Sequence, residues 1–323
     1  MNHNSSEQTT PAPPTPAGPV MIFGCGYVGT ALLRRLRAAG VAVGALTRNP
    51  DKVAALRGLG AAPVIEAELD DRGWHGDLAG DFGAVVNCVS SAGGGLDGYR
   101  KSYVEGQKSV LAWARERRVG QFVLTGSTSV YPQGGGAVVD ESAPTDGAPD
   151  TGRLVLASER LLREAGDAFG AWHILRLCGI YGPGRHYLLD QLRAGVTVFP
   201  GSGAHTLNTI HRDDIADALY LVLAKGGPDN SGIYNLADDR GAPKREVVRW
   251  LAAQIGAPPP DFDPDRVSPR LRRRGGPMPD RRIANDRFKT VFGWRPRYPD
   301  FREGYAAIFR AEAEGGGDAR QPS

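Results

Sequence analysis

Three glycines at positions 24, 26 and 29 follow directly after a short apolar run, Val20–Phe23. The run is rich in β-prone residues, which predicts a buried strand. The stretch from Thr30 to Ala39 carries leucines at helical spacing and ends before Gly40, which predicts a helix. A strand, a Gly-x-Gly-x-x-Gly turn and a helix in this order predict a βα unit that binds the diphosphate of a dinucleotide.

Each glycine of this turn has its own expected role. Gly24 permits the tight turn, Gly26 lets a diphosphate approach the backbone, and Gly29 lets helix and strand pack closely. The open N–H groups and the positive end of the following helix favour an anion. The intervening residues are expected to contact the cofactor as well, namely Cys25, Tyr27 and Val28. The alternative is a glycine-rich turn without a ligand.

Composition limits the remaining function classes. The chain has 323 residues, 41% hydrophobic and 23% charged, with a net charge of +3, which predicts a soluble globular protein of one large or two smaller domains. The basic run Arg270–Arg274 is expected to be a solvated loop, so we expect no nucleic-acid partner. Three scattered cysteines indicate a reducing compartment. With no long apolar run, we expect no membrane span and a cytoplasmic location.

Strand and helix patterns alternate through the first half of the chain. Strands are expected at 41–47, 63–65, 82–89 and from Gln121, with helices at 51–59 and 99–118 between them. We therefore predict an α/β fold with a Rossmann-type doubly wound parallel sheet over residues 20–178. A smaller substrate-binding α/β region, interleaved with the sheet, is expected over 179–312. Residues 1–19 and 313–323 are expected to be disordered tails.

The end of the second predicted strand bears on cofactor choice. In nicotinamide-binding folds an acidic residue there binds the free 2′-hydroxyl of NAD. Here Thr47, Arg48 and Asn49 offer no acid, and the Arg48 guanidinium can bind a 2′-phosphate. We expect NADP, with NAD as the alternative. A surface arginine before a helix is the other interpretation of Arg48, since Asn49-Pro50 is typical of a helix start.

Two further stretches are expected to contact the cofactor. Glu68 and Leu69 begin an acidic segment where such folds often contact adenine, although an exposed acidic turn fits equally. Cys88, Val89 and Ser90 end the fourth strand ahead of a glycine-rich loop, which is well placed to pass beneath the cofactor. The aromatic residues of the following helix, including Tyr103, are expected to lie in the core.

A cluster of hydroxyl residues follows the fifth strand, in the loop Ser127-Thr-Ser-Val-Tyr131. With the opening βα unit and the later Arg176–Gly184 stretch, it resembles the extended short-chain dehydrogenase/reductase superfamily over about residues 20 to 310. The resemblance implies that Ser127 hydrogen-bonds the substrate's reacting oxygen, with Thr128 and Tyr131 beside it. It also implies that Cys178 and Ile180 cover the nicotinamide.

The chain departs from that superfamily where the catalysis is carried out. The superfamily's acid/base pair is Tyr-x-x-x-Lys in the helix after this loop, and no such motif occurs in the sequence. The superfamily's helix usually has a Glu eight residues after the Tyr. Aligning that Glu with Glu159 places Thr151 at the Tyr position and Val155 at the Lys position, and neither side chain can transfer the proton. Tyr103 stands where the superfamily often has Asn. This pattern resembles the atypical, YeeZ-like branch, which lacks the active-site Tyr.

Residues after the sixth strand, expected at 170–177, are candidates for the substrate side. Tyr181, Arg185, His186 and His211 are expected to contact substrate, and we expect no metal, because the histidine spacing matches no ligand motif. A strand is expected at 205–211 and a loop at 199–203. The helices 99–118 and 153–168 offer apolar faces that fit either a homodimer interface or a core.

Two functions remain open at this point. One is an NADP-dependent oxidoreductase or epimerase of the atypical extended class, acting on a sugar-like or nucleotide-linked small molecule. Its proton donor would be recruited from Tyr131, Tyr181 or His186. The other is a dinucleotide-binding sensor or regulator without turnover. A structural scaffold would bind no cofactor.

Overall fold

A seven-stranded parallel sheet forms the centre of the protein. The computed structural model describes residues 14–91, 94–267 and 279–315, so Arg270–Arg274 and most of both predicted tails lie outside the described residues. The strand order is β12-β7-β5-β4-β1-β2-β3. Its members are β1 (Val20–Phe23), β2 (Val43–Thr47), β3 (Val64–Glu66), β4 (Phe82–Asn87), β5 (Val119–Ser127), β7 (Ala171–Leu177) and β12 (Gly232–Leu236). The predicted doubly wound fold is confirmed.

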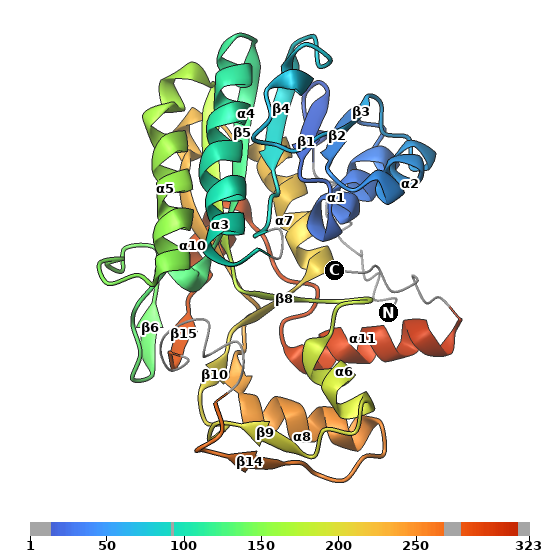
Figure 1. Cartoon of the computed structure of the whole chain (residues 1–323), viewed down its shortest axis with the longest axis vertical. Helices are drawn as coiled ribbons and strands as arrows, with labels where there is room; N and C mark the ends of the chain where they lie inside the picture. Colours follow the sequence, from blue (N-terminus) through green and yellow to red (C-terminus); the bar gives the residue numbers. More distant parts are fainter. Residues whose placement is uncertain (1–13, 92–93, 268–278, 316–323) are drawn as a thin grey trace, which may run out of the picture.

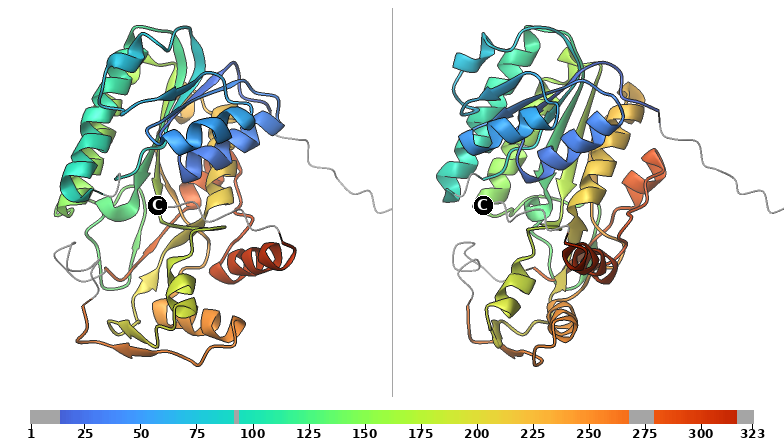
Figure 2. Two further views of the ribbon diagram at one scale, coloured as in Figure 1. Left: turned by 45° about the vertical axis from the view of Figure 1, so that its right-hand side comes forward. Right: turned by 90° about the vertical axis from the view of Figure 1, so that its right-hand side faces the viewer.

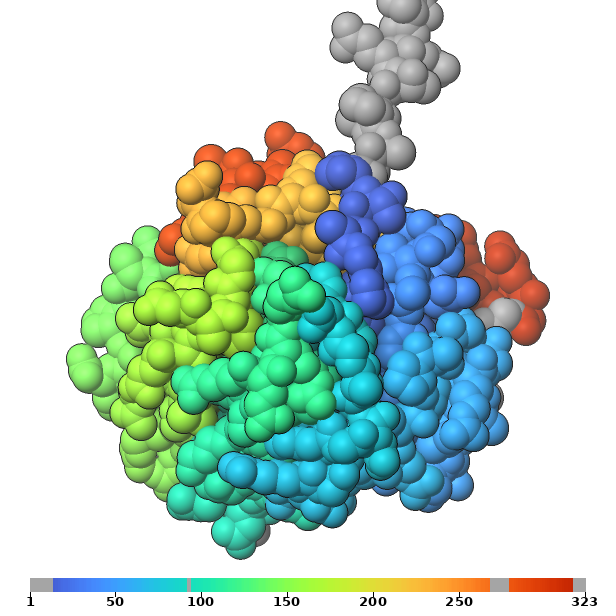
Figure 3. Space-filling model, turned by 90° about the horizontal axis from the view of Figure 1, so that it is seen from above, coloured from blue at the N-terminus to red at the C-terminus, as the bar shows by residue number. Residues whose placement is uncertain are grey.

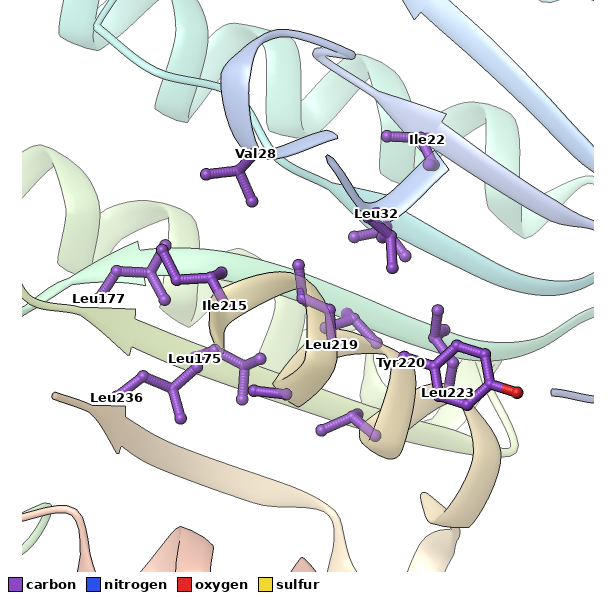
Figure 4. Close-up of a cluster of buried hydrophobic side chains, with 14 of the residues drawn as sticks. Ile22, Val28, Leu32, Leu175, Leu177, Ile215, Leu219, Tyr220, Leu223 and Leu236 are labelled. Atoms are coloured by element: carbon purple, nitrogen blue, oxygen red, sulfur yellow. The ribbon is translucent and has the colours of Figure 1, made fainter. Parts of the chain in front are cut away.

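Helices cover both faces of this sheet because alternate side chains of each strand point to opposite sides. Val20 and Ile22 face one core with α1 (Tyr27–Ala38), α2 (Val53–Gly58), α7 (Arg212–Lys225) and α10 (Asp286–Phe292). Met21 and Phe23 face the other, with α4 (Gly106–Arg115) and α5 (Asp150–Glu164). Figure 2 shows the two helical layers, and Figure 4 shows Ile22 and Leu32 facing Leu219 of α7 across the first core.

A smaller region lies at the carboxyl ends of the strands, in the lower half of Figure 1. Its helices are α6 (Tyr187–Arg193), α8 (Lys244–Gln254) and α11 (Phe301–Ala313), which share a third core around Phe199 and Leu251. Strand pairs join it together: β8 (Gly179–Tyr181) with β11 (Thr209–His211), β9 (Val198–Pro200) with β14 (Asp261–Asp263), β10 (Thr206–Leu207) with β13 (Ala242–Pro243), and β6 (Ala137–Val139) with β15 (Arg281–Ile283).

The second half of the chain is interleaved with the first. Strand β12 adds to the sheet beside β7, and α7 packs against α1. Seen from above in Figure 3, the yellow and orange segments of the second half lie beside the blue amino-terminal segments. The sheet and the smaller region are therefore joined by several crossings of the chain.

Three local expectations were wrong. The predicted helix 99–118 starts earlier, as α3 (Gly95–Tyr99), and runs through a π-helical segment, Arg100–Glu105, before α4. The predicted strand 205–211 divides at Asn208, because its side chain hydrogen-bonds across to Arg281 O (2.8 Å) and Ile283 N (2.8 Å). The predicted loop 199–203 begins inside β9, which pairs with β14.

Two expectations stay predictions. No helix among the described residues is long and apolar enough to cross a membrane, and the cytoplasmic location is not tested by that finding. The exposed large hydrophobic residues in the described part of the chain are Leu96, Val138, Tyr187, Val267 and Val291, and none lies on α4 or α5. Because burial within one chain does not show a contact between two chains, the homodimer through those two helices stays a prediction.

Candidate functional site

The glycine turn has a backbone that other residues would not fit. Gly24 has φ +69°, and a Cβ there would lie 2.9 Å from Val89 N. At Gly29 a Cβ would lie 3.1 Å from Ile22 Cγ2, so this glycine lets α1 approach β1. At Gly26 a Cβ would meet no heavy atom closer than Gly24 O at 3.8 Å. The turn is therefore tight on two sides and open at Gly26.

Helix α1 begins immediately after Gly26 with its amino end uncapped. Gly26 is the N-cap and provides no side-chain hydrogen bond, and the first turn holds no acidic residue. The first backbone N–H groups of a helix need acceptors from outside the helix. An uncapped, unopposed helix start beside an open glycine fits the diphosphate of a dinucleotide.

A cavity of about 1880 Å³ extends from this turn, along the carboxyl ends of the sheet strands, into the smaller region. Most predicted site residues line it: Gly24, Gly26, Tyr27, Val28, Arg48, Glu68, Leu69, Cys88, Val89, Ser90, Ser127, Thr128, Cys178, Ile180, Tyr181 and Arg185. The other predicted site residues lie behind the lining: Cys25, Gly29, Tyr131, His186 and His211.

The carboxyl end of β2 presents two cations to the cavity. Arg48 is exposed there, and Lys52, which the sequence analysis did not single out, lines the same wall. Thr47 Oγ1 accepts a hydrogen bond from Asn49 N (3.2 Å), and Asn49 Oδ1 accepts one from Asp51 N (3.0 Å). These bonds fix the turn that carries Arg48. Lys52 ends the short 3-10 helix Pro50–Lys52 that follows Arg48, and nothing in the sequence marked it as a cavity residue.

The acidic segment after β3 lies at the same end of the cavity. Lys101 Nζ is 3.5 Å from Glu68 Oε2 and 3.7 Å from Asp70 Oδ1. Leu69 is buried between them. The two carboxylates are therefore balanced by a cation, and both the adenine contact and the exposed acidic turn remain compatible with this arrangement.

The hydroxyl loop after β5 faces the cavity. Ser127 Oγ accepts a hydrogen bond from Ser129 N (3.1 Å), and its side chain is half-buried. Thr128 Oγ1 donates to Leu177 O (3.3 Å). Thr128 thus ties its loop to the end of β7, while Ser127 presents its hydroxyl group at the cavity wall.

Tyr131 was expected beside substrate, but the structure places it in a buried network. Its hydroxyl donates to Asn235 Oδ1 (2.8 Å) and accepts from Arg176 Nη1 (2.8 Å). Arg176 in turn donates to both carboxylate oxygens of Glu159, at 2.9 and 2.7 Å. Burial raises the pKa of Tyr131. The hydroxyl group is used to hold β5, β7 and β12 together behind the cavity wall.

The helix that should carry the acid/base pair does not face the cavity. Neither Thr151 nor Val155 of α5 lines it, and Val155 is fully buried. Glu159, the residue used to align this helix with the superfamily, is buried, and its Oε2 lies 2.7 Å from Arg176 Nη2. Helix α5 therefore carries no Tyr and no Lys, and none of its residues lines the cavity.

The histidines expected on the substrate side are held by other partners. His186 Nδ1 lies 2.9 Å from Asp190 Oδ1. His211 Nδ1 accepts from Asp213 N (3.2 Å), its ring packs on Tyr298, and burial lowers the pKa of His211 to about 4. A third histidine, His205, lines the cavity, whereas His186 and His211 do not. No group of three metal-ligating side chains occurs in the described ranges.

Two tyrosines of the predicted helix line the cavity, and Tyr103 is at the same time buried in the core, as expected. Tyr99 is half-buried, and Tyr103 is 7% exposed. Their rings stack with centroids 5.4 Å apart and planes at 15°. Burial and the neighbouring Tyr99 raise the pKa of Tyr103. They belong to α3 and the π-helical segment, which pack against α5, and π-helical turns are frequent at functional sites.

The chain is similar to several known proteins. The model of the NAD dependent epimerase/dehydratase family matches residues 20–237. Protein YeeZ from Escherichia coli is 29% identical, over 87% of this chain and 96% of YeeZ. A 2-alkyl-3-oxoalkanoate reductase from Stenotrophomonas maltophilia is 30% identical, over 81% of this chain and 86% of the reductase. A 3-diazoavenalumate denitrifying reductase from Streptomyces is 29% identical, covering 88% and 98%.

Solved structures agree on the fold. A conserved protein of unknown function from Silicibacter pomeroyi has a TM-score of 0.73 at 26% identity, covering 91% of this chain and 99% of its own. MoeE5, solved with UDP-glucose and NAD, has a TM-score of 0.76 at 22% identity and covers 92% and 99%. At that identity the likeness to MoeE5 extends to the fold alone.

Proposed function

We propose an activity for this chain from an established premise: the chain belongs to the NAD dependent epimerase/dehydratase family. It is an NAD(P)-binding protein of the extended short-chain dehydrogenase/reductase superfamily, with a YeeZ-like relative at 29% identity. The proposal is that it works as an NADP(H)-dependent oxidoreductase on a carbonyl or hydroxyl carbon of a small substrate. The observation that carries it is the cavity that joins the open glycine turn to the Ser127 loop.

The residues present fit the nicotinamide dinucleotide. The uncapped start of α1 and the open space at Gly26 suit its diphosphate. Arg48 and Lys52 suit a 2′-phosphate, and Glu68 and Leu69 lie where the adenine would be held. The bound cofactor would supply or accept the hydride, and the chain's own residues would position substrate and move the proton.

The preference for NADP rests on Arg48 and is tested by cofactor affinity. In Arg48→Ala we expect the dissociation constant for NADPH to rise at least tenfold, because a charge-assisted contact of about 1.5–3 kcal/mol is lost. The dissociation constant for NADH should hardly change. Arg57→Ala, an exposed arginine of α2 outside the cavity lining, is the matched control. Wild-type protein that binds NADH more tightly than NADPH would contradict the preference.

Tyr99 is the group that we propose as proton donor. Among the described tyrosines that line the cavity, Tyr27 donates its hydroxyl to Pro183 O (2.9 Å). Tyr103, Tyr181 and Tyr305 are buried, and Tyr187 is 63% exposed on α6. Tyr99 is half-buried on the element that packs against α5, the helix that holds the vacant Tyr position. Ser127, the first residue of the hydroxyl loop, is proposed to orient the reacting oxygen.

Turnover tests this assignment. NADPH oxidation is followed with a panel of 2-alkyl-3-oxo acids and nucleoside-diphosphate sugars, substrates of the kinds named for relatives. With any substrate that turns over, Tyr99→Phe should lower kcat about 100-fold or more, in the range of general acid catalysis. The dissociation constant for NADPH should stay unchanged. Tyr187→Phe, on the far side of the cavity, is the control, and an unchanged kcat in Tyr99→Phe would remove it as the donor.

A non-catalytic sensor is the second candidate, favoured by the absence of the Tyr-x-x-x-Lys motif from the sequence. The two candidates differ in one outcome. A sensor binds NADPH tightly and releases no product with any member of the panel, whereas the oxidoreductase consumes NADPH with at least one.

A further inference from the structure

A buried carboxyl group lies behind the cavity wall, two residues after β12. Asp238 is 5% exposed and does not line the cavity, but its Oδ2 lies 2.6 Å from the hydroxyl oxygen of Thr209, which does. The backbone N–H of Asp238 donates to Thr209 O (2.7 Å), so the two residues are held together at two points. Thr209 therefore lies between the carboxyl group and the cavity.

Thr209 lies at the same edge of the sheet as the hydroxyl loop. Ser127 pairs with Leu177 of β7, and Leu177 pairs with Leu236 of β12. Two residues beyond Leu177, Gly179 of β8 pairs with Thr209 of β11. Figure 1 shows β8 crossing between the sheet and the smaller region. Thr209 and Ser127 thus both line the cavity where the strands of the sheet end.

The surroundings of Asp238 favour its protonated form. Burial, and then the negative charges of Asp300, Asp239 and Asp214, raise the pKa of Asp238 to about 7. Its Oδ1 is buried and accepts no hydrogen bond from the described protein. No cation among the described residues forms an ion pair with it. A carboxyl group in such a place binds its proton more tightly than one in water.

The other charged groups of this cluster have partners of their own. Arg240 is paired with Asp300, Lys289 with Asp239, and the backbone N–H groups of residues 297 and 298 with Asp214. The thiol of Cys178 and the hydroxyl of Tyr181 also face Asp238, and both stay neutral because burial raises their pKa. Arg281 acts on Cys178 and donates to Thr128 O (2.8 Å).

The charge of Asp238 decides in which direction the Thr209 hydroxyl points. A carboxylate only accepts, so next to ionised Asp238 the single O–H of Thr209 donates to Oδ2, and the cavity meets only lone pairs. A protonated carboxyl group has an O–H of its own, which donates to Thr209 Oγ1 and frees the Thr209 O–H for a ligand. Below pH 7 the wall therefore offers a donor, and above pH 7 an acceptor.

The two states suit different ligands. A carbonyl oxygen can only accept a hydrogen bond, whereas a hydroxyl group can donate or accept. Two acceptors that face each other leave both without a partner, which weakens binding. The protonated pair therefore favours the carbonyl form of a ligand, and the ionised pair accepts only the hydroxyl form.

We propose that Thr209 donates a hydrogen bond to the carbonyl oxygen of the substrate, and that Asp238 is the positioning residue that keeps the Thr209 O–H directed into the cavity. This rests on the proposed function and adds a second hydroxyl group beside Ser127 at the reacting end. Asp238 keeps its proton during turnover, and Tyr99 remains the donor of the proton that completes the reduction.

Infrared spectra of the full chain over a pH series test the pair without a ligand. Wild type should show the carbonyl stretch of a protonated carboxyl group that disappears with a midpoint near pH 7. Asp238→Asn should lack this band, Thr209→Val should shift its frequency, and Thr209→Ser should restore it. Asp239→Asn removes an exposed carboxylate next to the pair and should keep the band. A band that is missing from wild type, or is the same in Thr209→Val, overturns the pair.

Binding of a matched pair of uncharged esters tests the effect on a ligand. Ethyl 3-oxohexanoate is titrated in the presence of NADP⁺ and ethyl 3-hydroxyhexanoate in the presence of NADPH, so that neither mixture reacts. In wild type the dissociation constant of the oxo ester should rise about tenfold from pH 6 to pH 8, and that of the hydroxy ester should hardly change. In Asp238→Asn the rise should disappear, because the amide N–H replaces the carboxyl O–H. In Thr209→Val the oxo ester should bind weakly at both pH values.

The outcome separates this pair from the cofactor proposal. Affinity for NADPH, measured in parallel, should be the same in wild type and Thr209→Val, which shows that the fold and the nucleotide end are intact. Binding of the oxo ester that does not vary with pH in wild type, or binding of neither ester, overturns the role of the pair. The NADP proposal is then decided by the NADPH titration alone.

Discussion

The turn after β1 has the three glycines with which the superfamily binds its cofactor, whereas helix α5 lacks the superfamily's acid/base pair. The turn is intact: Gly24 lies at a positive φ against Val89, Gly29 packs on Ile22, and Gly26 opens onto the cavity. Helix α5 keeps its place in the fold but contains neither the Tyr nor the Lys of the superfamily's acid/base pair. The first region acts through its backbone, and the second would act through side chains.

The difference shows which functions can be lost without loss of the fold. A side chain at Gly24 would meet Val89 in the loop after β4, and one at Gly29 would meet Ile22 of β1, so replacing either glycine disturbs the packing around the turn. Replacing a catalytic side chain on α5 leaves the helix intact, because its packing depends on other residues. Glu159 illustrates this, since it is buried against Arg176 and links α5 to the sheet. Helix α5 is therefore present and packed against the sheet although it lacks the superfamily's Tyr and Lys.

The largest effect is expected when the buried ion pair that links α5 to the sheet is broken. Glu159→Ala leaves the Arg176 guanidinium buried without its carboxylate, which should lower the free energy of unfolding by about 3–5 kcal/mol. Chemical denaturation measures this. Glu164→Ala, in an exposed pair with Arg160 of the same helix, should change it by less than about 0.5 kcal/mol. Similar small effects at both sites would refute a structural role for Glu159.

The turn should respond almost as strongly, at one glycine in particular. In Gly24→Ala the new methyl group meets Val89 N in addition to the left-handed backbone, so we expect a loss of about 3 kcal/mol. Gly40→Ala has a similar φ, +77°, with nothing within 4 Å, and should lose about 1 kcal/mol. Denaturation curves of the two variants give the comparison. Equal losses would show that the contact with Val89 is not tight.

An effect that depends on pH is expected at Asp238, which follows β12. Burial raises the pKa of Asp238 from 3.8 to about 7, partly offset by the hydrogen bond from Thr209 Oγ1. Asp300, Asp239 and Asp214 raise it further. The folded protein holds this proton more tightly than the unfolded chain, so the contribution is full below pH 4 and is lost as the pH rises to 7.

Asp238→Asn should therefore change stability differently at the two ends of this range. Relative to wild type, the variant should gain up to about 4 kcal/mol in the free energy of unfolding between pH 4 and 7, since the pKa is raised by about three units and each unit corresponds to about 1.4 kcal/mol. Denaturant titrations at several pH values measure the difference. A difference that does not vary with pH would show that Asp238 is already ionised in the folded protein.

The sequence was sufficient for features that depend on local pattern. The glycine turn, the alternating strands and helices, and the loss of Tyr-x-x-x-Lys were all apparent from the residues. Long-range partners were not: Tyr131 lies behind the cavity because Asn235 and Arg176, far along the chain, bind its hydroxyl. Tyr103 is buried in the core, as its helical spacing predicted, but nothing in the residues indicated that Tyr99 and Tyr103 also line the cavity. The pairing of Thr209 with Asp238 gave no signal, because it joins β11 to the segment after β12.

The central claim is that the turn after β1 holds the diphosphate of a nicotinamide dinucleotide. Calorimetric titration of NADPH into wild type and Gly26→Val tests it most directly, since a side chain at Gly26 would fill open space and leave the core packing alone. We predict saturable heat for the wild type, none for the variant, and a loss of stability of only about 1 kcal/mol at the helix N-cap. Equal binding by both proteins, or none by the wild type, would contradict the account.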